Sequence, residues 1–155
     1  MMKRSVVALL MLLAISATGT AFAAEIIDAT KPEQILAIAR GFGSATLEKD
    51  KSGDPKIVCK IEDIKFGIYF YGCSGGKNCN AIQFAAGWSG QEITLAAINK
   101  WNTEKRLSRA FLDSDNDPIL KMDINLDYGV TRQNLEDSFE IWEKTLGAFE
   151  EALSE

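Results

Sequence analysis

The clearest pattern in the chain is an alternation of apolar and polar residues in short segments of its second and third quarters. Because successive side chains of a strand point to opposite faces, this alternation predicts strands with one buried face. Residues 118–127 give the cleanest example, with Leu120, Met122, Ile124 and Leu126 on one side and polar residues between them. We expect strands over 45–48, 56–61, 65–72, 81–88, 106–113 and 118–127.

Apolar residues at helical spacing predict three helices between and around these strands. The first begins at Lys31-Pro32-Glu33 after a candidate cap, Thr30, and the second covers 92–101. The third follows a cap at Thr131 and carries an apolar stripe made of Leu135, Phe139, Trp142, Leu146, Phe149 and Leu153. We expect the stripe to lie on the chain's own sheet, and a helix seam shared with another chain is the alternative.

The resulting order, α-β-β-β-β-α-β-β-α, predicts an α+β fold in which helices pack on an antiparallel sheet. No repeat or linker interrupts it, so residues 24–155 are expected to form a single domain. Residues 1–23 have a different pattern: two cations, an apolar run over 6–15, and Ala21-Phe22-Ala23. This is the layout of a secretory signal peptide cleaved after Ala23. We therefore expect a periplasmic or secreted protein of a Gram-negative bacterium.

Charge and composition then exclude several classes of function. The formal net charge is −5, and it falls to −7 once Lys3 and Arg4 leave with the signal peptide, which contains no acid. Such an acidic chain is not expected to bind nucleic acid. No later segment reaches the ~20 apolar residues of a membrane span, so no membrane insertion is expected either. The chain contains no histidine, which excludes Ser-His-Asp and Cys-His catalysis and the usual zinc sites. We expect no enzyme activity, no cofactor and no metal.

Three cysteines remain to be assigned. Cys73 and Cys79 flank a Gly-rich loop between two predicted strands, and a disulfide closing that loop suits an exported protein. Cys59 shares a predicted strand face with Ile57 and Ile61, so a buried thiol is expected there. Pairing of Cys59 with either other cysteine stays open.

One acidic segment has the first part of a calcium-binding pattern. Asp113, Asp115 and Asp117 stand at the first three ligand positions of a calcium loop. Pro118 then replaces the glycine that turns such a loop, and Ile124 replaces its last carboxylate. A polar hairpin turn is the better interpretation.

Several motifs of the second half occur together: Asn99, Trp101, Asn102, Arg106 and Trp142. In this arrangement the chain resembles the YbjN-domain family over about residues 32–153. The resemblance implies a fold similar to that of type III secretion chaperones and a role among bacterial sensory-transduction regulators. It implies no catalytic residue.

The expected function is a non-enzymatic periplasmic protein-binding or chaperone-like module, in stress or envelope regulation, acting on an unknown protein partner as a monomer or homodimer. The expected contact surface comprises Tyr69, Tyr71, Gln83, Trp88, Lys77 and Asn78. Burial of the two tyrosines beneath a helix is the alternative. Two other functions stay open: inhibition of an exported lysozyme or protease through the 73–79 loop, and hydrolysis by paired carboxylates among Asp113, Asp115, Asp117 and Asp123.

Overall fold

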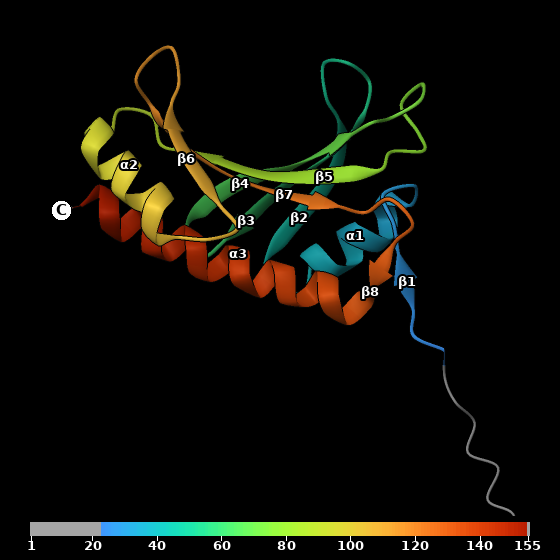
Figure 1. Cartoon of the computed structure of the whole chain (residues 1–155). Coiled ribbons are helices and arrows are strands. Elements are labelled where there is room, and N and C mark those ends of the chain that lie inside the picture. Colours follow the sequence, from blue (N-terminus) through green and yellow to red (C-terminus); the bar gives the residue numbers. More distant parts are fainter. Residues whose placement is uncertain (1–22, 155) are drawn as a thin grey trace, which may run out of the picture.

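The structure is a computed structural model that describes residues 23–154. The predicted signal peptide, residues 1–23, lies outside the described residues except for Ala23. Three helices pack with two sheets (Figure 1). The helices are α1 (Pro32–Ala39), α2 (Leu95–Glu104) and α3 (Arg132–Leu153). The strands are β1 (Ile26–Ile27), β2 (Ser44–Lys49), β3 (Pro55–Ile61), β4 (Ile64–Tyr71), β5 (Ala81–Gly87), β6 (Arg109–Leu112), β7 (Pro118–Asn125) and β8 (Val130–Thr131).

The main sheet has six strands in the order β2-β3-β4-β5-β7-β6, and every neighbouring pair is antiparallel. The predicted α+β class and all six predicted strands are confirmed. β1 and β8 form a separate two-stranded sheet that the sequence did not predict. Each has only two residues, and a period of two cannot be recognised over so short a segment.

The core lies between one face of the main sheet and α3, which crosses that face over its whole length (Figure 1). Phe84 of β5 lies near its centre, with ring centroids 4.9 Å from Phe139 and 5.4 Å from Trp142 of α3. The predicted stripe of α3 is buried here, with every member from Leu135 to Phe149 at most 1% exposed. The stripe thus packs on the chain's own sheet, and the seam shared with another chain is wrong.

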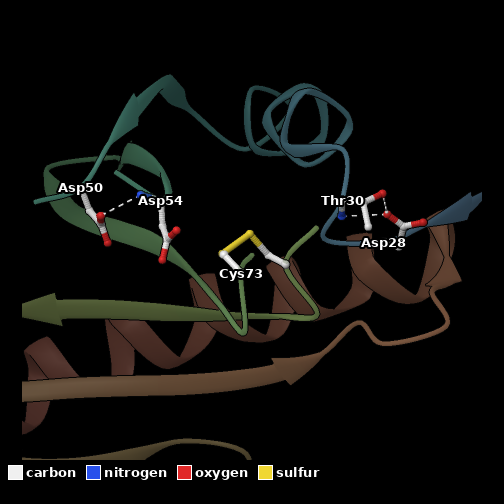
Figure 2. Close-up of a disulfide and its surroundings, with 6 residues drawn as sticks. Asp28, Thr30, Asp50, Asp54 and Cys73 are labelled. Carbon is white, nitrogen blue, oxygen red and sulfur yellow. Dashed lines mark hydrogen bonds between the residues drawn. A yellow bond between two sulfur atoms is a disulfide. The ribbon is translucent and has the colours of Figure 1, made fainter. Parts of the chain in front are cut away.

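Side-chain caps explain where two of the helices begin. The Thr131 hydroxyl accepts a hydrogen bond from the Asn134 N–H at 3.2 Å, as predicted for α3. The Thr94 hydroxyl likewise caps α2 by accepting a hydrogen bond from a backbone N–H of its first turn. Because Thr94 is the cap, α2 begins three residues later than expected. The predicted cap Thr30 is wrong, because Lys31 occupies the cap position of α1. The Thr30 N–H instead donates to the Asp28 carboxylate at 2.8 Å, which closes a turn before the helix (Figure 2).

A compact loop joins β2 to β3. One carboxylate oxygen of Asp50 accepts hydrogen bonds from the N–H groups of Ser52 (2.8 Å) and Asp54 (3.0 Å, Figure 2). Gly53 has a φ of 86°, a conformation that a residue with a Cβ rarely adopts. The Asp50 N–H donates to the Asp54 carbonyl at 2.9 Å, and this bond fixes the register of the hairpin.

Candidate functional site

The main sheet has a second face, turned away from α3, which we call the open face. Figure 1 shows α1 and α3 on the other side of the sheet and α2 beside β6, so none of these helices covers it. Tyr71 on this face is 47% exposed, which is incompatible with burial of its ring beneath a helix. The centre of the open face is made of Tyr69, Tyr71, Gln83, Ala85, Gly87, Arg109, Ile119, Lys121 and Asp123.

A row of polar side chains crosses this face from strand to strand. Lys56, Tyr69, Gln83 and Asp123 are direct partners in the register of β3, β4, β5 and β7. The Lys56 ammonium lies 5.2 Å from the centroid of the Tyr69 ring, a distance suited to a cation–π contact. The Gln83 amide donates to Asp123 Oδ1 at 2.5 Å. We call these four residues, with Arg109 at the end, the polar row.

Arg109 completes the row from β6, where it donates to Asp123 Oδ2 at 2.6 Å. Both partners are about half exposed, so the ion pair is screened by solvent. Gln83 is different, because it is only 6% exposed and yet lies on the face without a helix. Tyr71 donates to its Oε1 at 3.4 Å, and burial followed by the charge of Asp123 raises the pKa of Tyr71. A buried amide with partners on both sides gives this part of the face a fixed arrangement of donors and acceptors.

Beside the polar row lies a shallow hollow of about 300 Å³. Its floor consists of Ala85 and Gly87 of β5, which have almost no side chain to fill it. Tyr69 forms one wall, and Ile119 and Lys121 form the opposite wall. The hollow therefore combines an aromatic ring, an aliphatic side chain and an ammonium group around a bare piece of sheet. Such a surface suits one apolar side chain of a bound protein segment.

The structure does not bring all the predicted surface residues together. Tyr69, Tyr71 and Gln83 lie on the open face. Trp88 does not, because its ring centroid lies 5.1 Å from that of Phe149 on the side of α3. The alternation explains this, because Trp88 is separated from the buried Phe84 by an even number of positions and from Gln83 by an odd number, which puts it on the face of Phe84.

Lys77 and Asn78 lie in a separate exposed loop between β4 and β5. The predicted disulfide between Cys73 and Cys79 closes this loop, and Ser74 and Lys77 exchange two backbone hydrogen bonds inside it. Figure 2 shows the disulfide beside the Asp50–Asp54 turn. Gly76 comes so close to Gly53 that a Cβ on it would meet the Gly53 carbonyl oxygen at 2.7 Å. Insertion of this loop into an enzyme cleft stays a prediction.

The Asn-x-Trp-Asn motif has a structural role at its last two positions. The Trp101 ring is 6% exposed, and its centroid lies 4.9 Å from that of Phe149. Asn102 hydrogen-bonds to both backbone groups of Ala110 on β6. Asn99 and Arg106 are exposed. Trp142 is fully buried in the core.

A second groove, of about 1100 Å³, lies between α2 and the end of α3, with Leu95 and Leu153 at its sides.

The acidic residues and the free cysteine that the sequence singled out lie in a turn, in an ion pair and in the core. Asp113 closes a turn by accepting hydrogen bonds from the N–H groups of Asp115 and Asp117. Asp123 is paired with Arg109. Burial raises the pKa of the Cys59 thiol to about 12, which keeps it protonated and poorly nucleophilic. Among residues 23–154, no group of three or more His, Cys, Asp or Glu side chains could hold a metal ion. No helix in this part of the chain is long and apolar enough to cross a membrane.

Most residues of the hollow were not predicted from the sequence. Ala85, Gly87, Ile119 and Lys121 were not expected at a binding surface. The alternation did carry a signal, because Ala85 and Gly87 share the parity of Gln83, and Lys121 shares that of Asp123. What it could not supply was the pairing of β5 with β7, which places the two sets side by side.

Comparison with known proteins identifies one family. Residues 31–155 match the model of the YbjN family, described as "Putative bacterial sensory transduction regulator". No curated protein and no solved structure matches the chain.

Proposed function

The chain belongs to the YbjN family, and we propose that it is a non-enzymatic, chaperone-like binding protein of the periplasm that holds a segment of another protein on its open face. The family description fits a regulatory or binding role. The location is supported by the predicted signal peptide and by the Cys73–Cys79 disulfide, which persists in oxidising compartments.

The observation that carries the proposal is the buried Gln83 beside an unfilled hollow on the open face. Gln83 is satisfied by Asp123 and Tyr71, so the polar row is ordered before any ligand arrives. A preformed surface loses less side-chain entropy on binding than a mobile one. The hollow next to it exposes apolar walls at Tyr69 and Ile119, which an apolar side chain of a partner would remove from water.

The test is suppression of aggregation of a thermally unfolding model protein, citrate synthase, by the chain purified from the periplasm of a Gram-negative host. We expect the wild-type protein to delay light scattering in a dose-dependent way. Ala85→Trp fills the hollow and should abolish most of this effect. Wild-type protein without any effect on scattering would contradict the proposal.

A matched control variant separates loss of the hollow from a general effect of an added indole. Gly147 lies in α3, and a Cβ built on it meets no atom within 4 Å. Gly147→Trp should therefore retain wild-type suppression, while thermal unfolding shows that both variants are folded. Equal loss in the two variants would remove the open face from the mechanism.

A further inference from the structure

The two outer hairpins of the main sheet are built in the same way. β2–β3 and β6–β7 are each closed by a loop in which an Asp N–H donates to the carbonyl of the residue four positions later, from Asp50 to Asp54 and from Asp113 to Asp117. Hydrogen-bonded pairs alternate with non-hydrogen-bonded pairs in an antiparallel ladder. On each edge strand, the residues of the non-hydrogen-bonded pairs direct their backbone N–H and carbonyl groups away from the sheet. These residues are Ala45, Leu47 and Lys49 on β2 and Ala110 and Leu112 on β6.

On β6 this outer edge is covered. The Asn102 side chain donates to the Ala110 carbonyl at 2.9 Å and accepts from the Ala110 N–H at 2.8 Å. One amide thus satisfies both outward groups at the middle of the strand, as a neighbouring strand would. α2, which carries Asn102, lies along this edge (Figure 1).

On β2 the matching position, Leu47, is uncovered. Leu47 lies as many residues before its loop as Ala110 does before the other loop. Within the described residues, however, neither the N–H nor the carbonyl of Leu47 has a hydrogen-bond partner. The Ala45 carbonyl accepts only one long bond, from Arg40 at 3.3 Å, which confirms that this carbonyl points outward. β2 contains no proline and no bulge, two of the devices that prevent a strand from pairing, and its charged residues, Glu48 and Lys49, lie together at its end.

We propose that β2 pairs antiparallel with β2 of a second copy of this chain, which joins two six-stranded sheets into one. The inference does not depend on the proposed function. The strand suits its own copy when Thr46 lies on the two-fold axis. Ala45 then pairs with Leu47 of the partner in hydrogen-bonded positions, and Glu48 faces Ser44. No like charges oppose each other in this register.

Cysteine cross-linking tests this arrangement directly. Thr46 would face its own copy in a non-hydrogen-bonded pair, where Cβ atoms lie about 4.5–5.5 Å apart, close to the span of a disulfide. Thr46→Cys should therefore give a disulfide-linked dimer under mild oxidation with diamide. Glu48→Cys, on the same exposed side of the strand, should not link to itself but should link to Ser44→Cys when the two variants are mixed. The buried thiol of Cys59 is not expected to compete.

Light-scattering mass across a concentration series supplies the second measurement. We expect a concentration-dependent dimer that Ala45→Pro abolishes, because proline removes an outward N–H without removing a bond of the β2–β3 pair. Leu112→Pro, an outward position on the other edge, should leave the dimer intact. A monomer throughout the series, with Thr46→Cys no more reactive than Glu48→Cys, would overturn the proposal. A dimer that survives in Ala45→Pro would also overturn it, since another surface would then hold the copies together.

Discussion

The two faces of the main sheet are built from adjacent residues and yet differ completely. Phe66 and Phe84 point toward α3, where their rings meet Trp142, while the next residues, Gly67 and Ala85, leave the open face nearly bare. One face is filled with aromatic rings, and the other carries the polar row and a hollow. In this sheet the aromatic packing is concentrated on one side, and the proposed function uses the other side.

The largest effect should come from breaking the filled face. Phe84→Ala removes a fully buried ring that contacts Phe139 and Trp142, and it leaves a cavity behind. We expect the free energy of unfolding to fall by about 3–5 kcal/mol, measured by urea denaturation. Ala85→Ser, one residue away on the open face, should change it by less than about 0.5 kcal/mol. Similar losses in both variants would mean that the two faces do not differ as described.

A smaller effect should follow from raising the pH, through Cys59 on the filled face. The unfolded thiol titrates near 9.0, whereas burial raises the pKa in the folded protein to about 12. Between these values the unfolded chain has lost a proton that the folded chain keeps. The stability from this thiol is thus complete below pH 9 and decreases above it, with a slope that approaches about 1.4 kcal/mol per pH unit.

Comparison with Cys59→Ala isolates this contribution from lysines and tyrosines that titrate in the same range. Urea unfolding at pH 8, 9 and 10 should show the wild type losing stability faster than the variant. Parallel curves would show that Cys59 ionises as easily in the folded protein as in the unfolded chain.

The smallest effect on stability should come from the polar row. Asp123→Asn removes the charge that pairs with Arg109, but both side chains are about half exposed. We expect the free energy of unfolding to change by less than about 1 kcal/mol, measured by the same urea denaturation. The same variant should weaken aggregation suppression, because Gln83 loses its charged acceptor. A loss of several kcal/mol would assign the row to the stability of the fold instead.

The sequence predicted those parts of the fold that repeat a pattern locally. The alternation over 118–127 located β7 to within two residues, and the apolar stripe located α3 and its buried side. The candidate site was harder, because Gln83 and Asp123 are 40 residues apart and meet only through the pairing of β5 with β7. Nothing local decides whether β7 or β6 joins β5. Trp88 was predicted on the contact surface because it is aromatic. The alternation along β5 already placed it on the same side as the buried Phe84.

The amide of Asn102 has a consequence for how large an assembly of this chain can become. A sheet with two free edges can add copies at both ends and grow into a fibre without limit. Here one end is terminated within the same chain, by a side chain that occupies the place of a seventh strand. If β2 pairs with its own copy as proposed, the covered position on β6 favours a closed dimer over a fibre.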